Sequence, residues 1–325
     1  MYILNATSAP TNVKDYAKHF IERAPFRIAK DGHTGLRDNT LRNYHNFLTI
    51  WEKFERQSGG TVELLHLDQS RIVAFKQWLL NDCAYSVNNA SRLMSILKTI
   101  ALDAQKSGYP THPYVNFIKS FRVKQQDKII HTLSFREIEK IEKTNVPVHL
   151  ERTKKWLLIG CWVGQRVSDL LTLTPDQIRP AKNKGLYVDF LQQKTSRKVT
   201  VGVINPMAIH ILTQDFPKRM YPERFNKQLK LVLKEAGLTQ MVKAHRYNGK
   251  TKRKETGIFP KYAIIASHDL RRSFATNFYG KIPTPILMNM TGHARETSFL
   301  TYIGMDQKRD SFADAFMQGV AKMEL

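Results

Sequence analysis

The chain has few cysteines, no long apolar run and a shortage of acidic residues. Its 325 residues include only two cysteines, Cys83 and Cys161, with no paired Cys/His spacing, which argues against a disulfide framework and a structural zinc site. The longest apolar stretch, residues 156–163, is too short for a membrane span, which needs about 20 residues. The N-terminus lacks the basic flank of a signal peptide. These absences predict a cytoplasmic globular protein with no membrane partner.

Acidic residues are outnumbered by basic ones. The chain has 51 Lys and Arg against 28 Asp and Glu, a formal net charge of +23 at pH 7 and a pI near 10.0. Residues 241–280 hold nine Lys or Arg and two acids, whereas residues 301–325 hold three and four. A polyanion is the natural partner of such a chain, although a ribosomal or membrane-surface protein could be as basic. The near-neutral C-terminal end is a poor candidate for contact with DNA.

Hydrophobic periodicity predicts a helical first part. Apolar residues recur at steps of three and four, and helices are expected over 13–24, from a cap at Thr40 to Gly59, from a cap at Asp68, and from a cap at Ser86 to Gly108. Together they predict a four- or five-helix bundle over residues 13–124, after a tail over 1–12. Residues 121–128 are polar, basic and without periodicity, which indicates an interdomain linker, assigned to 125–131.

The rest of the chain predicts a mixed domain over residues 132–310. Ser134 with Glu137 predicts a capping box, and the apolar segment 152–163 predicts a helix in the core. Strands are expected over 186–188 and 199–203, joined by a turn that carries Lys194. Helices are expected over 224–236, 268–279 and 284–290. The predicted fold class is therefore mainly α with a small β-hairpin, in two domains.

Two histidines, an arginine and a tyrosine lie close together in the sequence near the C-terminus. His268 and Arg271 are three positions apart on a predicted helix, where both side chains can point at one ligand. His293 follows Gly292, and Tyr302 comes nine positions later. Arg166 stands where an apolar helix meets a second amphipathic segment. Each residue alone has an ordinary structural explanation, but their joint order on a basic chain indicates attack on a phosphodiester by a phenol.

In these motifs the sequence closely resembles the tyrosine recombinases, the phage-integrase type of site-specific recombinase, over about residues 35–310. The matching motifs are Gly-x-Arg-x-Ser-Asp-Leu at 164–170, a hairpin lysine, His-x-x-Arg at 268–271 and Gly-His at 292–293. The resemblance implies a SAM-like helical core-binding domain followed by an α+β catalytic domain. It implies that the catalytic residues are Arg166, Lys194, His268, Arg271, His293 and Tyr302. Arg197 and Lys198 are alternates for the hairpin lysine, and Arg272 stands where the family often has histidine.

These residue types suit the chemistry that the resemblance implies. A phenol has a pKa near 10, so Tyr302 needs a base as it attacks, and His268 is the candidate. The guanidinium forks of Arg166 and Arg271 can hold the charge that develops on the non-bridging oxygens. Lys194 can protonate the leaving 5′ oxygen, and His293 can hydrogen-bond the phosphate. The expected product is a 3′-phosphotyrosyl link formed without metal, ATP or another cofactor, and no Walker-type loop occurs.

The resemblance further implies double-stranded DNA as the partner, bound at the nucleoid by a homo-oligomer, a tetramer, with accessory DNA-bending proteins. The candidate phosphate contacts are basic residues near the His-x-x-Arg box, namely Lys243, Arg246, Lys250, Lys252, Arg253, Lys254 and Arg272. A solvated loop is the other interpretation of residues 243–254. A tail helix is expected over 311–325, with an apolar stripe of Phe312, Phe316, Val320 and Met323. It either docks on a neighbouring protomer or folds back on its own core.

Three alternatives remain, of which two use the same chemistry and the third lacks catalysis. A type IB topoisomerase-like enzyme or a hairpin-forming DNA strand transferase would use the same six residues. The helical first domain favours a recombinase over the former, and the chain is short for the latter. A catalytically silent DNA-binding regulator would be expected to lack one or more of the six residues, and none is missing.

Overall fold

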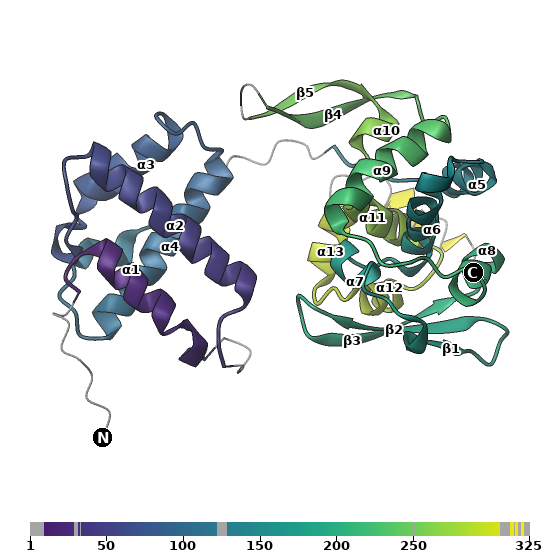
Figure 1. Cartoon of the computed structure of the whole chain (residues 1–325), viewed down its shortest axis with the longest axis horizontal. Coiled ribbons are helices and arrows are strands. Elements are labelled where there is room, and N and C mark those ends of the chain that lie inside the picture. Colours follow the sequence, from purple (N-terminus) through teal and green to yellow (C-terminus); the bar gives the residue numbers. More distant parts are fainter. Residues whose placement is uncertain are drawn as a thin grey trace. The chain divides into compact units, whose positions relative to one another are not determined.

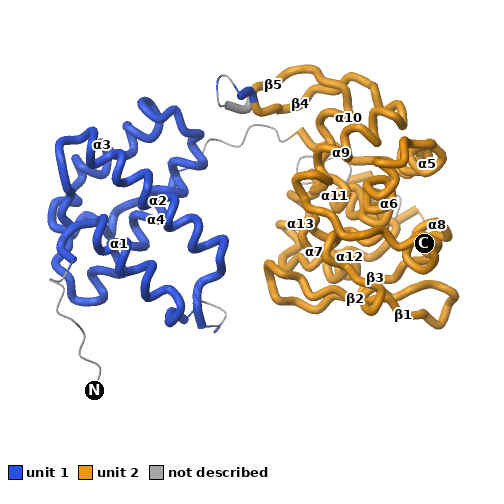
Figure 2. The backbone as a smooth tube through the Cα atoms, in the orientation of Figure 1, with its two compact units in different colours: residues 1–127, 248–253 blue, residues 128–247, 254–325 orange. Residues whose placement is uncertain are grey.

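The structure is a computed structural model, and it describes residues 10–28, 32, 34–121, 129–249, 251, 253–305, 313, 314, 316, 317, 320 and 321. The chain forms two compact units (Figure 2), residues 1–127 with 248–253, and residues 128–247 with 254–325. Residues 125–128 of the expected linker, and Phe312 and Met323 of the expected tail stripe, lie outside the described residues. Over the part of the chain that is described, no helix is long and apolar enough to cross a membrane.

The first unit is a helical bundle (Figure 1). Its helices are α1 (Val13–Glu22), α2 (Asp38–Gln57), α3 (Gln69–Leu80) and α4 (Val87–Lys106), with 3₁₀ turns η1 (Ala24–Phe26), η2 (Leu64–His66) and η3 (Pro113–Phe117). The side chains of Asp68 and Ser86 accept N–H bonds from the first turns of α3 and α4, as their sequence positions predict. The predicted cap at Thr40 is wrong. Helix α2 begins two residues earlier, and Asp38 places its carboxylate in the first turn, where the helix dipole favours it.

An aromatic cluster fills the core of this first unit. Trp51 and Phe75 are fully buried, with ring centroids 4.7 Å apart, and Phe54 packs on Phe75 at 5.0 Å. The Trp51 indole N–H donates to the buried Glu55 carboxylate at 3.0 Å, and the Val62 N–H donates to the same carboxylate at 3.0 Å. The buried acid therefore has the partners that burial demands, and it ties α2 to the segment that follows it.

The second unit packs its helices around α6. These are α5 (Phe135–Lys143), α6 (Val148–Val163), α7 (Val167–Leu170), α8 (Pro206–Thr213), α9 (Pro222–Glu235), α10 (Lys261–Ile264), α11 (Ser267–Phe278), α12 (Thr284–Thr291) and α13 (Glu296–Ile303), with a 3₁₀ turn η4 (Pro175–Gln177). Helix α6 contacts α5, α8, α9 and α11. Because neighbours surround it, consecutive residues Trp156, Leu157, Leu158 and Ile159 are all buried.

A three-stranded antiparallel sheet completes this core. Strands β1 (Ile178–Pro180), β2 (Leu186–Gln192) and β3 (Arg197–Val203) lie in the order β1–β2–β3, with Val188 opposite Val201 and Gln192 opposite Arg197. Alternate residues of β2 and β3 are buried, as a sheet with one covered face requires. Gln192 holds a buried position although it is polar. The turn over 193–196 places Lys194 at its second position.

A second, two-stranded ribbon was not predicted. It consists of β4 (Met241–Asn248) and β5 (Arg253–Pro260), and in Figure 1 it lies at the end of the unit opposite the β1–β3 sheet. The interpretation as a loop is therefore wrong for residues 243–248 and 253–254, which belong to the two strands. The ribbon was missed because basic residues such as Lys243 and Arg246 are exposed along β4 and hide the alternation that marks a half-buried strand.

Candidate active site

The six residues predicted to be catalytic lie at five places in the second unit. Arg166 precedes α7, and Lys194 lies in the β2–β3 turn. His268 and Arg271 are on α11, with His268 in the first turn. His293 follows the end of α12, and Tyr302 is in the last turn of α13. Residues separated by up to 136 positions in the sequence therefore belong to one packed unit.

The Tyr302 ring lies between two histidines and two arginines. Its centroid is 5.1 Å from the ring of His268 and 5.1 Å from that of His293. The guanidinium carbons of Arg271 and Arg272 lie 5.9 and 5.0 Å from the same centroid, within the range of cation–π attraction. The hydroxyl donates a hydrogen bond to the carbonyl of His268 at 3.2 Å. The structure thus brings four side chains together around one phenol.

Burial makes this phenol harder to ionise. It raises the pKa of Tyr302 to about 12, although the positive charges of Arg271 and Arg272 act in the opposite direction. The phenolate is disfavoured because burial removes the water that would stabilise its charge. Tyr302 is therefore protonated at neutral pH, and it needs a proton acceptor at the moment of attack.

Arg271 is the most deeply buried charge of the group. Its side chain is 1% exposed, and its guanidinium donates to the carbonyl of Gly164 at 3.2 Å and to the carbonyl of Thr291. Burial, followed by the nearby charge of Arg166, lowers the pKa of Arg271 to about 10. It still carries its charge at neutral pH. An anion placed between Arg166 and Arg271 would relieve their repulsion.

Arg166 is positioned by a buried glutamine. Helix α6 ends at Gly164, which has a left-handed φ of +62°, and a Cβ there would lie 2.4 Å from the Phe274 ring. Only glycine suits this helix end. The chain then turns so that the Arg166 guanidinium donates to Oε1 of Gln192 at 3.1 Å. Gln192 is fully buried.

His293 is a neutral imidazole in this environment. Burial and then the charges of Arg271, Arg166 and His268 lower its pKa to about 4. The hydroxyl of Thr291 lies 2.6 Å from the Leu287 carbonyl and 2.8 Å from Nδ1 of His293. Because the hydroxyl has one proton, which the carbonyl accepts, we assign the imidazole proton to Nδ1. Nε2 is then left as an acceptor in the DNA-free protein.

Arg272 departs from the predicted DNA contact. Its side chain is 9% exposed, and the guanidinium donates to the carbonyl of Tyr302 at 3.0 Å and to the carboxylate of Asp269 at 2.5 Å. Asp269 in turn accepts the N–H of Ala266 at 2.9 Å. Arg272 therefore holds the backbone that carries Tyr302, and a charge directed inward in this way is poorly placed to reach a phosphate.

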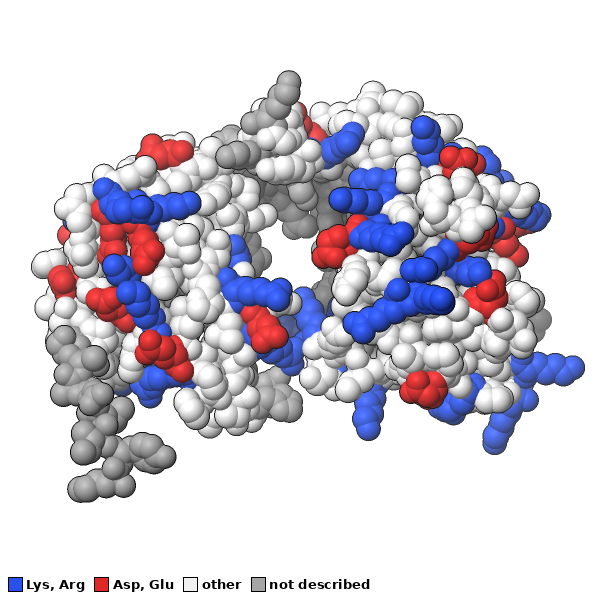
Figure 3. All heavy atoms as spheres, in the orientation of Figure 1, with Lys and Arg blue, Asp and Glu red and all other residues white. Residues whose placement is uncertain are grey.

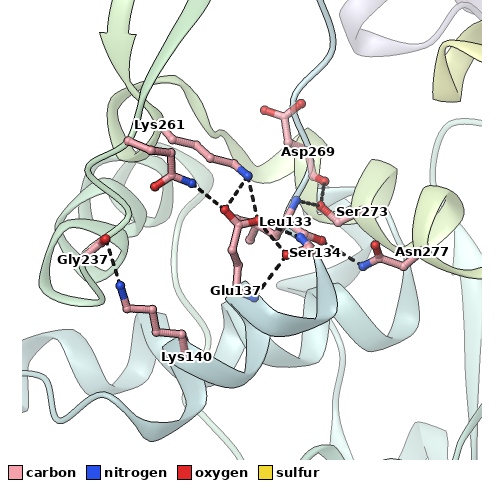
Figure 4. A network of polar contacts seen from close by, with 10 residues as sticks. Leu133, Ser134, Glu137, Lys140, Gly237, Lys261, Asp269, Ser273 and Asn277 are labelled. Atoms are coloured by element: carbon pink, nitrogen blue, oxygen red, sulfur yellow. Dashed lines mark hydrogen bonds and ion pairs between the residues drawn. The ribbon is translucent and has the colours of Figure 1, made fainter.

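Polar contacts fix α11 beneath the site (Figure 4). The Ser273 hydroxyl donates to the carbonyl of Asp269 at 2.6 Å and accepts the N–H of Leu133 at 2.7 Å, while Asn277 donates to the carbonyl of Leu133 at 2.9 Å. Beside them is the predicted capping box of α5, in which Ser134 and Glu137 bond each other. These bonds hold the helix of His268 and Arg271 to the start of the unit.

The Glu137 carboxylate also joins α5 to α10 (Figure 4). It accepts both Lys261, at 2.6 and 2.7 Å, and Gln240, at 2.7 Å. Burial raises the pKa of Glu137, but its bonds with Lys261 and Ser134 outweigh that effect and lower it from the ordinary value. Lys261 is 13% and Glu137 18% exposed as side chains, so this pair belongs to the scaffold rather than to a solvent-facing site.

The remaining predicted residues are exposed or lie outside the described residues. Lys194 is exposed in its turn, and Lys243 and Arg246 are exposed on β4. Lys250 and Lys252 lie outside the described residues, as do the side chains of Arg253 and Lys254. Among the residues that the structure describes, no three His, Cys, Asp or Glu side chains gather as metal ligands would.

Two buried polar residues of the site could not be identified from the sequence. Gln192 contacts Arg166, and the Asp169 carboxylate, 3% exposed, accepts the N–H of Gln193 at 3.1 Å. A glutamine at a strand end is usually exposed, so composition gives no signal for Gln192. Asp169 lies within the Gly-x-Arg motif, which was its only indication.

Known proteins share these motifs and this fold. The family model described as the phage integrase family matches residues 131–309. No curated protein matches the sequence. Among solved structures, a lambda integrase (75–356) dimer bound to a COC′ core site has a TM-score of 0.63 at 15% identity, covering 89% of this chain and 94% of that one.

Two further structures show the same fold. XerH site-specific recombinase bound to a palindromic difH substrate has a TM-score of 0.60 at 14% identity, covering 94% of this chain and 95% of that chain. The Tn1549 transposon integrase, in complex with circular intermediate DNA, has a TM-score of 0.58 at 14% identity, covering 90% and 95%. At these identities the likeness establishes the fold.

Proposed function

The chain belongs to the phage integrase family of tyrosine recombinases, enzymes that break and rejoin DNA, and from this premise we propose that it is a site-specific recombinase with Tyr302 as its nucleophile. One observation carries the proposal. The Tyr302 ring lies within 5.9 Å of two arginine guanidiniums and 5.1 Å of two histidine rings. This set supplies a nucleophile, proton acceptors and, in Arg271, positive charge for a phosphodiester, while Arg272 holds the backbone of the nucleophile.

The first step is attack by the phenol on the phosphorus atom. The Tyr302 hydroxyl gives up its hydrogen bond to the His268 carbonyl and approaches the phosphorus atom. The His268 imidazole takes the phenolic proton as the O–P bond forms. The P–O5′ bond breaks at the same time, and the Lys194 ammonium gives a proton to the departing oxygen. A 3′-phosphotyrosyl link and a free 5′-hydroxyl result. Because the link retains the bond energy, a second 5′-hydroxyl can reverse the step and join a new strand.

The arginines and His293 stabilise the phosphate. Arg166 and Arg271 repel each other in the free protein, so a phosphate between them gains attraction to both and removes that cost. The same negative charge raises the pKa of His293, which is lowered to about 4 without DNA. Nε2 can then be protonated and donate to a non-bridging oxygen. Arg272 takes no part in binding the phosphate, and we propose that it fixes the Tyr302 backbone instead.

The proposed partner is double-stranded DNA, bound by a homotetramer in which each chain supplies one active site. The support is the family membership, the related structures, which include a lambda integrase tetramer bound to a Holliday junction, and the net charge of +23. Figure 3 shows lysine and arginine side chains spread over the visible face of the second unit. We propose Lys243 and Arg246 of β4 as phosphate contacts, together with Arg253 and Lys254 at the start of β5. Lys250 and Lys252, also proposed, lie outside the described residues.

Trapping the covalent adduct tests the proposal. The full chain is incubated in EDTA with sheared DNA from the genome that encodes it, the reaction is stopped with detergent, and the DNA that remains attached to protein is sequenced. Wild-type protein should yield an adduct at one recurring site, without ATP. Tyr302→Phe lacks only the phenolic oxygen and should yield none, while it binds the same DNA with the same affinity.

Two results would count against the proposal. An adduct that persists in Tyr302→Phe would place the nucleophile elsewhere. Tight DNA binding without any adduct would instead support a catalytically silent regulator. Once the site is known, a plasmid that carries two copies separates the remaining alternatives, because a recombinase exchanges the segments whereas a topoisomerase-like enzyme only relaxes the supercoils.

A further inference from the structure

A chain of buried amides connects the catalytic elements of the second unit. Gln165 and Gln192 are 1% and 0% exposed, and Nε2 of Gln192 donates to Oε1 of Gln165 at 2.9 Å. Nε2 of Gln165 donates to the carbonyls of Val163 at 3.0 Å and Met290 at 2.8 Å. The pair therefore spans the ends of α6 and α12. Neither glutamine contacts the Tyr302 ring.

Every polar group of the Gln192 side chain is used. Its Oε1 accepts the Arg166 guanidinium at 3.1 Å and the Thr195 hydroxyl at 3.0 Å. Its Nε2 reaches the Thr291 carbonyl at 3.5 Å in addition to Gln165. A carboxylate of the same size could accept the first two bonds but could not donate the other two. The geometry thus requires an amide, in one orientation.

The same side chain bonds Arg166, shares an acceptor with Arg271 and bonds the lysine turn. The carbonyl of Thr291 that faces Gln192 is also the acceptor of the Arg271 guanidinium. On the other side, Thr195 is the neighbour of Lys194, and the backbone carbonyl of Gln192 accepts the N–H groups of Thr195 at 3.3 Å and Ser196 at 2.8 Å. Gln192 is therefore the point where the β2–β3 turn, Arg166 and the backbone beside His293 meet.

We infer that Gln192, held by Gln165, is a positioning residue that keeps the Lys194 turn in register with the Arg166 and Arg271 pair. This inference rests on the proposed function, in which Lys194 protonates the leaving oxygen. A general acid works only if its proton lies at the oxygen of the bond that breaks, and an error of about 1 Å in such placement can cost on the order of 100-fold in rate. Gln192 limits that error because it is hydrogen-bonded both to Arg166 and to Thr195, the neighbour of Lys194.

The experiment compares Gln192→Met with Gln177→Met. Methionine keeps the length of glutamine and removes its hydrogen bonds. Gln177 also donates to β2, at the carbonyl of Asp189 in the middle of the strand, 2.9 Å away. Its Oε1 accepts from Thr174, so these hydrogen bonds go to none of the six predicted catalytic residues. It therefore controls for loosening of the sheet. Single-turnover adduct formation is measured on the trapped site for each variant, together with thermal unfolding.

A second substrate identifies the step that fails. Replacing the bridging 5′ oxygen by sulfur gives a thiolate leaving group, whose pKa of about 8.5 is far below that of an alkoxide, so it departs without a general acid. We expect Gln192→Met to slow adduct formation between about tenfold and about 100-fold on the oxygen substrate and to recover at least part of that loss with sulfur. Gln192→Glu should behave like Gln192→Met, because it cannot donate to Gln165.

The outcomes separate the two claims. If wild-type protein forms an adduct and Gln192→Met matches Gln177→Met on both substrates, the positioning role is wrong and the recombinase proposal stands. An equal defect on both substrates would remove the link to Lys194. If wild-type protein forms no adduct, the proposed function fails first. Hydrogen exchange then tests the structural half, since the amides of residues 193–198 should exchange faster in Gln192→Met than in Gln177→Met.

Discussion

At the residue scale, the surroundings of His293 make its imidazole harder to protonate than that of the free amino acid. Its pKa is lowered to about 4, mainly by burial and then by the surrounding positive charges. Between pH 6.5 and about 4 the unfolded chain therefore binds a proton at this position that the folded chain does not bind. Stability must fall as the pH falls through that window.

His293→Asn should remove this dependence. The difference in unfolding free energy between wild type and variant should change by at most about 3 kcal/mol between pH 7 and pH 4, since each pKa unit corresponds to about 1.4 kcal/mol. Urea unfolding at pH 7, 5.5 and 4.5 gives the measurement. Parallel curves for the two proteins would show that His293 is protonated as easily in the folded as in the unfolded state.

Some residues of the site could be predicted from the sequence, and others could not. Arg271, His268 and Tyr302 could be selected because their spacing matches a known motif, and the structure brings them together. Gln192 could not, since nothing in a strand end predicts that its amide is buried against Arg166. Arg272 was predicted to contact DNA because the sequence shows its charge. The sequence does not show that its side chain points inward, toward the Tyr302 carbonyl.

At the scale of elements, two glycines that end structural segments offer a matched comparison. Gly292, at the end of α12, has a φ of +66°, and a Cβ there would lie 2.3 Å from Oε1 of Gln192. Gly280, beyond α11, has a φ of +77°, and a Cβ there would meet nothing within 4 Å. Both positions impose the left-handed cost of about 1–2 kcal/mol on another residue.

Gly292→Ala should therefore be the more damaging substitution. Besides the backbone cost, it displaces a buried amide whose unmade hydrogen bonds cost about 1–3 kcal/mol. Chemical denaturation should show a loss of roughly 2–4 kcal/mol for Gly292→Ala and about 1 kcal/mol for Gly280→Ala, and only the first should slow adduct formation. Similar losses in both would mean that the chain at Gly292 relaxes away from Gln192.

Elements with strong periodicity were predictable and the exposed ribbon was not. Apolar spacing indicated α4, an apolar segment indicated α6, and the Ser134–Glu137 pair marked the start of α5. Strands β4 and β5 escaped notice because their stability depends on pairing with each other rather than on a buried stripe. Local sequence patterns do not predict such pairing between strands.

At the scale of the whole molecule, charge sets the expected response to salt. DNA binding that releases counterions weakens as salt rises, with a slope of about 0.9 per phosphate contact in a plot of log affinity against log salt. Replacing Lys243 and Arg246 by methionine should reduce that slope by up to about 2. A fluorescence titration of a labelled duplex between low and moderate salt measures it.

The control for this titration removes the same charge elsewhere. Lys143 bonds Glu139 at 2.6 Å, and Arg179 bonds Asp189 at 2.8 Å, so each charge already has an acidic partner. Methionine at these two positions should leave the slope unchanged. If both pairs of substitutions alter the slope equally, the effect belongs to net charge, and the β4–β5 ribbon is no particular site of contact.

The contacts of Tyr302 within its own chain have a consequence for genetic complementation. Its hydroxyl, its carbonyl and its ring are all held by groups of its own chain, those of His268, Arg272, His293 and Arg271. Under the proposed function, we expect a chain with this arrangement to cut with its own tyrosine. Two defective alleles, one without the tyrosine and one without the buried arginine, should then fail to complement each other in the same cell, however well their products assemble.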